Sequence, residues 1–208
     1  MKKELVIKVC GMREYNNVQA VASFLPDYMG FIFYSKSPRY VGDINPDVFD
    51  DLKESVIKVG VFVNASSTEI LEKKRKYGFE VVQLHGDESP GDCAVLKSKG
   101  LKVIKAIAVS MESDIQECDA FVQVVDYFLF DTKGKNYGGH GVTFDWGLLK
   151  SYQLDIPFFI SGGIGLEEMK ALPEYEQLIG VDLNSKFEIE PGLKDVDALE
   201  QGFKLVRG

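Results

Sequence analysis

The 208-residue sequence predicts an α/β fold, a single-domain (β/α)8 TIM barrel that takes up residues 1–208. Eight short runs of apolar, β-branched or aromatic residues recur along the chain, and this composition is typical of strands. Stretches of helical character separate most of these runs. Eight such units within about 200 residues match a closed parallel barrel near the lower end of its size range.

The eight runs are predicted as strands because each is bounded by polar or turn-forming residues. They cover residues 5–9, 28–33, 57–63, 80–84, 101–107, 126–130, 157–160 and 178–181. The clearest helices between them are predicted over residues 67–77, 90–99 and 166–172. Repeated strand–helix units require right-handed crossovers and therefore a parallel sheet.

The alternative architecture is an open, doubly wound sheet. Such a sheet would carry a Gly-x-Gly-x-x-Gly turn after an early strand, and the sequence has none. No Pro-rich or Ser-rich linker divides the chain, which favours one domain.

Composition and charge exclude several classes of function. An apolar fraction of 45% is ordinary for a globular chain and excludes intrinsic disorder. The net charge of −8 lacks the basic footprint of a nucleic-acid-binding or anionic-membrane-binding protein. No apolar run approaches the roughly 20 residues of a membrane span, and Glu4 and Lys8 interrupt any secretory signal at the start. We therefore expect a cytoplasmic protein with neither a nucleic-acid nor a membrane partner.

The cysteines and histidines do not form a metal-binding pattern. Cys10, Cys93 and Cys118 show no Cys-x-x-Cys spacing, so neither a disulfide framework nor a zinc site is expected. His85 and His140 form no His-x-His or His-Glu-x-x-His motif, so no catalytic metal is expected.

Two consecutive loops have the composition of a phosphate-binding site. In barrels of this kind, active sites lie at the carboxyl ends of the strands, and the loops after the seventh and eighth strands commonly bind phosphate. The residues that we assign to phosphate binding are Ser161, Gly162, Gly163, Asn184, Ser185 and Lys186. Paired glycines can also simply turn the chain, but two such loops together predict a phosphorylated small-molecule substrate.

Cys10 ends the first predicted strand at what we expect to be an exposed rim position, although a lone cysteine is more often structural. A thiol must ionise to act as a base and therefore needs a nearby cation. Lys8 lies two residues earlier and faces the barrel interior with Cys10. A buried lysine needs a carboxylate partner, and both Asp182 and Asp131 are candidates.

Asp131 follows the apolar run of the sixth predicted strand. A carboxyl group in apolar surroundings tends to have a raised pKa, as a general acid near neutral pH requires. The alternatives are a helix cap or a salt bridge to Lys133. The glycine-rich loop over residues 133–141 has the composition of a lid.

Two further polar residues follow other strands. Arg39 could grip a carboxylate in bidentate fashion or be an ordinary surface arginine. His85 could make hydrogen bonds at the rim or be a structural histidine.

Several strings, taken in order, resemble the phosphoribosylanthranilate isomerases of tryptophan biosynthesis through almost the whole chain. They are Lys8-Val9-Cys10-Gly11, Ser37-Pro38-Arg39-Tyr40-Val41, Val59-Gly60-Val61-Phe62-Val63-Asn64, Val82-Gln83-Leu84-His85-Gly86-Asp87-Glu88, Phe130-Asp131-Thr132-Lys133, Thr143-Phe144-Asp145-Trp146, Ser161-Gly162-Gly163 and Gly180-Val181-Asp182-Leu183-Asn184-Ser185. The resemblance implies an isomerase of the intramolecular oxidoreductase type. Its reaction is the Amadori rearrangement of N-(5′-phosphoribosyl)anthranilate to 1-(2-carboxyphenylamino)-1-deoxyribulose 5-phosphate, without cofactor or metal.

The resemblance fits the roles inferred from the residues. Cys10 is expected to be the base and Asp131 the acid. The expected substrate-binding residues are Arg39, His85, Asp182 and Lys8. Arg39 suits the anthranilate carboxylate, and Asp182 suits a ribose hydroxyl or Lys8. The partner is then a phosphorylated sugar–anthranilate, and the protein is expected to be a monomer or a homodimer.

The chain departs from the family pattern at two positions. Lys186 stands where glycine is common in the phosphate loop, and His140 stands where Thr or Ser is usual. The alternatives are another phosphosugar enzyme, such as indole-glycerol-phosphate synthase or the tryptophan synthase α-subunit, a bifunctional sugar isomerase, or a non-catalytic phosphosugar-binding barrel. Those two pathway enzymes need other acid–base residues, and the bifunctional isomerase needs two aspartates in place of the Cys10 and Asp131 pair.

Overall fold

The eight predicted strands are all present in the computed structural model, which describes residues 5–52, 54–133 and 143–208. They pair in parallel, each with its neighbour in sequence, and β1 pairs with β8 to close the barrel. The strands are β1 (Val6–Cys10), β2 (Tyr28–Ile32), β3 (Ile57–Phe62), β4 (Val81–Leu84), β5 (Lys102–Val109), β6 (Tyr127–Thr132), β7 (Phe158–Ile160) and β8 (Leu178–Leu183). The predicted (β/α)8 TIM barrel is therefore confirmed.

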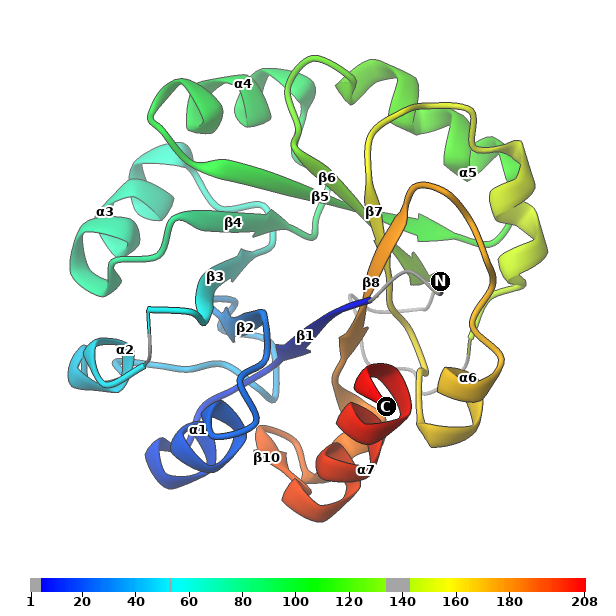
Figure 1. The fold of residues 1–208 in the computed structure, drawn as a ribbon. Coiled ribbons are helices and arrows are strands. Elements are labelled where there is room, and N and C mark those ends of the chain that lie inside the picture. Colours follow the sequence, from blue (N-terminus) through cyan, green and yellow to red (C-terminus); the bar gives the residue numbers. More distant parts are fainter. Residues whose placement is uncertain (1–4, 53, 134–142) are drawn as a thin grey trace.

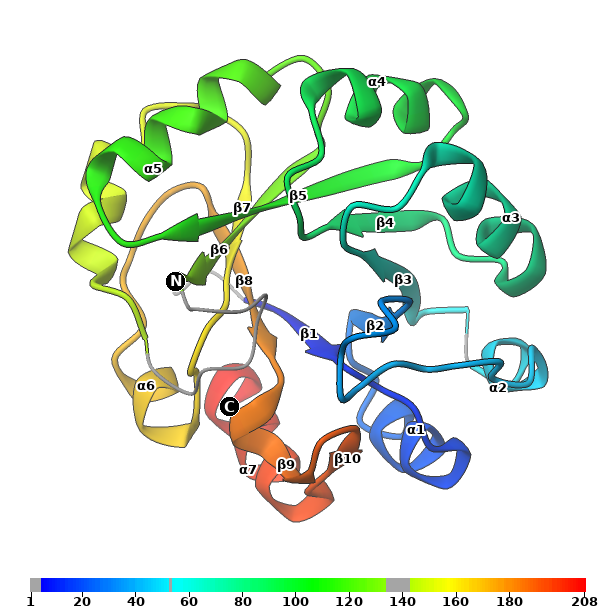
Figure 2. The same cartoon turned by 180° about the vertical axis from the view of Figure 1, so that it is seen from behind.

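Helices surround the barrel on its outer side (Figure 1). They are α1 (Tyr15–Ala22), α2 (Asp47–Asp50), α3 (Ser67–Tyr77), α4 (Pro90–Ser98), α5 (Glu112–Gln116), α6 (Leu166–Lys170) and α7 (Val196–Arg207). Short 3-10 turns add η1 (Glu117–Phe121), η2 (Trp146–Ser151) and η3 (Ser185–Phe187). A small antiparallel hairpin, β9 (Glu188–Glu190) and β10 (Leu193–Lys194), lies between β8 and α7 (Figure 2).

Local sequence signals account for the helix boundaries. The side chain of Ser66 accepts a hydrogen bond from the Glu69 amide at the start of α3, and Gly78 ends this helix with a φ of 65°. Ser89 and Asp92 form a reciprocal capping box at the start of α4, with Pro90 in its first turn. The predicted bounds of α3 are matched, whereas α4 and α6 end one and two residues earlier than predicted.

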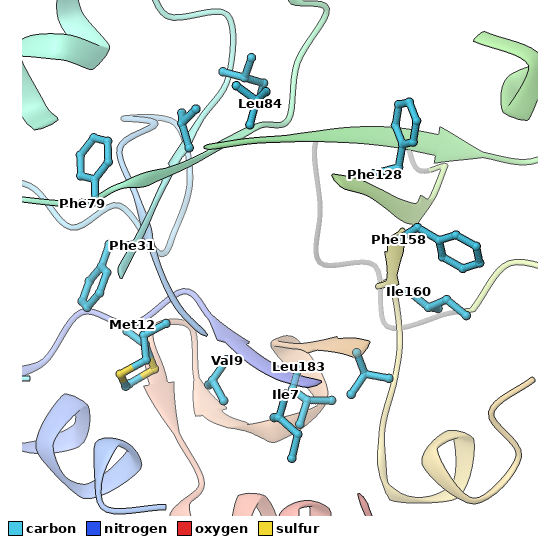
Figure 3. Packing of buried hydrophobic residues seen from close by; sticks show 14 of the residues in the cluster. Ile7, Val9, Met12, Phe31, Phe79, Leu84, Phe128, Phe158, Ile160 and Leu183 are labelled. Atoms are coloured by element: carbon cyan, nitrogen blue, oxygen red, sulfur yellow. The ribbon is translucent and has the colours of Figure 1, made fainter. Parts of the chain in front are cut away.

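Alternation along each strand divides the apolar side chains into two groups. In β1, Ile7 and Val9 belong to the large cluster between sheet and helices, and Cys10 belongs to a smaller cluster inside the barrel. Figure 3 shows the outward-facing group, with Phe79 and Phe158 directed away from the barrel axis. The inner cluster also contains Val59, Val61, Val81, Ile104, Leu129 and Phe159. The barrel interior is therefore largely a packed apolar core, and the polar side chains that line the cavity lie near the carboxyl ends of the strands.

Several strands continue beyond their predicted ends. The strand β6 ends at Thr132 and β8 ends at Leu183. Asp131 and Asp182 are therefore the second-last residues of paired strands and do not follow them. Hydrogen-bonded pairing with the adjacent strands extends β6 and β8, and this pairing cannot be seen in a local sequence pattern. Within the described residues, no helix has the length and apolarity needed to cross a membrane.

Candidate active site

An open cavity lies where the carboxyl ends of the strands converge. It is lined by Cys10, Ile32, Tyr34, Ser37, Arg39, Val61, Val63, Gln83, His85, Asp131, Ser161, Gly162, Gly163, Ile164, Asp182, Asn184 and Ser185. All the predicted site residues line this cavity except Lys8 and Lys186. Residues from both halves of the sequence therefore meet in one place.

Cys10 lies at the end of β1 and is only 3% exposed, so the expectation of an exposed rim position is wrong. Both edges of β1 are paired, and Gly30 of β2 is the register partner of Cys10. A Cβ atom on Gly30 would lie 2.7 Å from the Cys10 sulfur and 3.2 Å from the Lys8 nitrogen. The absence of a side chain at Gly30 thus leaves the space in which thiol and ammonium meet.

Lys8 is fully buried, and its Nζ donates a hydrogen bond of 2.8 Å to Oδ1 of Asp182. The two residues are register partners on the adjoining strands β1 and β8. Of the two candidate carboxylates, the structure selects Asp182. Burial acts to lower the pKa of Lys8, but Asp182 and Cys10 together outweigh burial and the pKa is raised. Lys8 therefore stays charged beneath the cavity without lining it.

The Cys10 thiol is influenced by two opposing effects. Burial raises its pKa above the ordinary value, while the charges of Lys8 and Lys194 act to lower it. The net direction is upward, so the cations moderate the cost of ionising the thiol without abolishing it.

Asp131, His85 and Gln83 form a hydrogen-bonded chain across the cavity wall. The His85 Nε2 atom lies 3.2 Å from Oδ2 of Asp131, and the Gln83 amide nitrogen lies 2.8 Å from Nδ1 of His85. Oδ1 of Asp131 accepts a hydrogen bond of 2.8 Å from the Thr132 amide. Lys133 instead binds Asp114 at 2.9 Å, so the alternative of a salt bridge from Asp131 to Lys133 is wrong.

Arg39 is engaged by a carboxylate of the protein itself. Its Nε and Nη2 atoms donate to the two oxygens of Glu188 at 2.9 and 2.7 Å. Glu188 Oε1 also accepts a 2.7 Å hydrogen bond from Lys194, which contacts Asn184 Oδ1 at the same distance. Burial acts to raise the pKa of Glu188, but Arg39 and Lys194 together lower it. Arg39 still lines the cavity, with its guanidinium orientation set by Glu188.

Sequence reasoning missed Gln83, Glu188 and Lys194. Gln83 carried a usable signal, because a polar residue on a buried strand two positions before His85 shares its face. Glu188 and Lys194 carried none, because only the hairpin β9–β10 returns them to the loop that holds Arg39.

The two predicted phosphate loops lie side by side at the ends of β7 and β8. Gly162 has a φ of +84°, and a Cβ atom there would lie 2.6 Å from Oδ1 of Asp131, so glycine is required at this position. Ser185 begins the turn η3, and Asn184 holds the N-cap position. The Lys186 side chain is exposed and does not line the cavity.

One wall of the cavity is apolar and adjoins Arg39. It is formed by Ile32, Tyr34, Val61 and Val63, from β2, β3 and the segments that follow them. An aromatic ring that carries a carboxylate fits an apolar wall beside a guanidinium. The predicted lid falls mainly on residues 134–142, which include His140 and lie outside the described residues.

Comparisons with known proteins show which family the chain resembles. The family model described as N-(5′phosphoribosyl)anthranilate (PRA) isomerase matches residues 7–204. The N-(5′-phosphoribosyl)anthranilate isomerase of Parabacteroides distasonis is 44% identical over 200 residues, covering 94% of this chain and 90% of the relative. The isomerase of Phocaeicola vulgatus is 46% identical over 193 residues, covering 92% of each chain.

Solved structures show the same similarity. Phosphoribosyl anthranilate isomerase from Thermotoga maritima superimposes with a TM-score of 0.85 at 32% identity, covering 98% of this chain and 99% of that one. A phosphoribosyl anthranilate isomerase in complex with reduced 1-(o-carboxyphenylamino)-1-deoxyribulose 5-phosphate superimposes with a TM-score of 0.82 at 29% identity, with the same coverage.

Proposed function

This chain belongs to the N-(5′-phosphoribosyl)anthranilate isomerase family, and from that premise we propose that Cys10 and Asp131 are its catalytic base and acid. The enzyme catalyses the Amadori rearrangement of N-(5′-phosphoribosyl)anthranilate to 1-(2-carboxyphenylamino)-1-deoxyribulose 5-phosphate in tryptophan biosynthesis. The observation that carries the assignment is that a thiol from β1 and a carboxyl group from β6 line the same cavity.

The first step opens the sugar. Asp131 donates a proton to the furanose ring oxygen, the C1′–O bond breaks, and the anilino nitrogen supplies the electron pair that forms the C1′=N bond. The contacts from His85 and Thr132 hold the carboxyl group of Asp131 in one orientation for this transfer.

The second step moves a proton from carbon. The Cys10 thiolate removes the C2′ proton, and the released electron pair forms the enolamine and neutralises the nitrogen. The enolamine then gives up its hydroxyl proton and takes a proton at C1′, which yields the ketose. Solvent returns the proton from Cys10 to Asp131, and the net reaction is an isomerisation.

The remaining predicted residues define where the substrate is held. Arg39, oriented by Glu188, binds the anthranilate carboxylate, and the adjoining apolar wall contacts the anthranilate ring. Backbone N–H groups around Gly162, Gly163 and Ser185 meet the 5′-phosphate. Asp182 and His85 face the sugar, whereas Lys8 acts through Asp182 and Cys10 because it does not line the cavity.

Lys186 contributes a backbone N–H to the phosphate site, but its exposed side chain does not line the cavity. The substrate is a free small molecule, and we place the enzyme in the cytoplasm as a monomer or homodimer. No nucleic-acid or membrane partner enters this proposal.

Turnover of freshly generated phosphoribosylanthranilate tests the function directly. The fluorescence of the anthranilate adduct is expected to fall when purified wild-type protein is added, with a metal chelator present throughout. Folded protein that binds the substrate without any loss of fluorescence would instead indicate a non-catalytic phosphosugar-binding barrel. Inhibition by the chelator would contradict the metal-independent mechanism.

Replacement of Lys8 by methionine tests its role beneath the cavity. Lys8→Met leaves Asp182 buried without its partner, so we expect a stability loss of about 3 kcal/mol. Activity at a temperature where the variant stays folded is expected to fall about tenfold or more, because Cys10 loses a neighbouring cation. Urea unfolding and the fluorescence assay measure the two effects. The matched control is Lys170→Met, at a half-exposed surface lysine, and wild-type behaviour of both variants would contradict the assignment.

A further inference from the structure

Gln83 is a buried polar residue of the cavity wall for which the proposed mechanism supplies no role. It lies on β4, is 1% exposed and faces the barrel interior between Val82 and Leu84, which face outward. Its amide nitrogen contacts His85, but its Oε1 atom is buried and accepts no hydrogen bond from any residue that the structure describes. An unpaired buried acceptor on a residue that lines a binding cavity is unfavourable until another group donates to it.

The contact between Gln83 and His85 determines which ring nitrogen carries the proton. The amide nitrogen of glutamine can only donate, so Nδ1 of His85 must accept and is unprotonated. The single ring proton of neutral His85 then lies on Nε2, which is 3.2 Å from Oδ2 of Asp131. The histidine can therefore donate to the carboxylate.

The opposite amide orientation would reverse this chain of donors. Oε1 would then accept a proton from Nδ1, and neutral His85 would present a bare Nε2 to the carboxylate. Asp131 would lose a donor, and the Gln83 amide nitrogen would be the unpaired group in the cavity. With neutral His85 and ionised Asp131, as after the proton transfer, the orientation in the structure pairs both residues and leaves an acceptor for the substrate.

We propose that Gln83 is a positioning residue that holds His85 in the Nε2–H form against Asp131, while its Oε1 accepts a hydrogen bond from an N–H or O–H group of the substrate. The substrate carries such donors on its anilino nitrogen and sugar hydroxyls. This inference rests on the proposed role of Asp131 as the acid.

The protonation state of His85 can be measured without any turnover. The chain has two histidines, so ¹⁵N-labelled protein with His140→Gln reports His85 alone. Two-bond ¹H–¹⁵N spectra at a pH of about 8.5, above the ordinary histidine pKa of about 6.5, are expected to show a protonated Nε2 and an unprotonated Nδ1. In Gln83→Glu, whose carboxylate can only accept, Nδ1 is expected to become protonated. A protonated Nδ1 in the protein with Gln83, or an unprotonated Nδ1 in Gln83→Glu, would overturn the proposal.

Kinetics test the consequences for catalysis. Gln83→Met keeps the volume of the side chain but removes its hydrogen bonds, so kcat is expected to fall about tenfold to hundredfold and KM to rise several-fold. Gln153→Glu, at an exposed loop glutamine, is the matched control for the charge change in Gln83→Glu and is expected to keep wild-type kinetics. Wild-type kcat and KM in a folded Gln83→Met variant would overturn the proposed role of Gln83 but would leave the proposed acid and base untouched. Full activity of Asp131→Asn would instead remove the proposed acid on which the inference rests.

Discussion

The Cys10→Ser variant is expected to lose about a thousandfold in kcat while it continues to fold and bind substrate. A positioned general base contributes about 10²- to 10⁴-fold, and a serine hydroxyl ionises far less readily than a thiol. Cys10 is buried, and serine nearly matches its volume, so the surrounding contacts are kept. The fluorescence assay measures kcat, and binding of a non-reacting product analogue shows whether the site is intact.

The pH dependence of the wild-type enzyme provides a second measure of the same base. Burial raises the pKa of Cys10 despite the opposing charges of Lys8 and Lys194, so the active thiolate becomes more abundant as the pH rises. The acid must keep its proton while Cys10 loses its own, so we expect kcat/KM to pass through a maximum as the pH changes. The part of the profile that depends on the thiolate should be absent in Cys10→Ser.

Cys93 is the control for these measurements. It is a buried thiol on α4, in the layer between sheet and helices, and burial raises its pKa to about 11. Cys93→Ser is expected to keep the wild-type pH profile wherever the protein remains folded. A Cys10→Ser variant with undiminished turnover, or a Cys93→Ser variant with the same loss as Cys10→Ser, would show that the base is misassigned.

The Asp131→Asn variant is expected to lose about 10²- to 10⁴-fold in kcat, because the amide cannot protonate the ring oxygen. Asparagine has the same shape and its oxygen can still accept from His85 Nε2–H, so substrate binding should change little. Stopped-flow fluorescence, with binding followed separately from turnover, divides the loss between kcat and KM.

Asp126→Asn is the matched control, because Asp126 immediately precedes the amino end of the same strand and pairs with Lys97 at 2.9 Å. It is expected to lower stability without a specific effect on kcat. A loss in Asp131→Asn that appears only in KM would mean that Asp131 binds the substrate and that another group is the acid.

Much of the fold followed from local patterns. Runs such as 57–63 and 101–107 are strongly β-branched, and capping signals at Ser66 and Ser89 mark the start of two helices within a residue. Strand alternation placed Lys8 and Cys10 on the same face, because side chains repeat every second residue. The paired loops after the seventh and eighth strands have a recognisable glycine- and serine-containing composition. These features depend on neighbours along the chain, which a sequence displays directly.

The arrangement of the site required the tertiary structure. The burial of Cys10 depends on Gly30 of the adjoining strand, and the choice of Asp182 over Asp131 as the partner of Lys8 depends on the register between β1 and β8. The ion pair between Glu188 and Arg39 depends on the hairpin β9–β10, which brings together residues that are far apart in the sequence.

Amino-acid order alone was therefore sufficient for the barrel, its family resemblance and the candidate acid and base. Strand register and packing decided how buried Cys10 is, which carboxylate pairs with Lys8, and that the Gln83 amide contacts the His85 ring. The physical reason is distance: backbone preferences and alternation act over a few residues, whereas hydrogen bonds and charges act between atoms that only the closed barrel brings within about 3 Å.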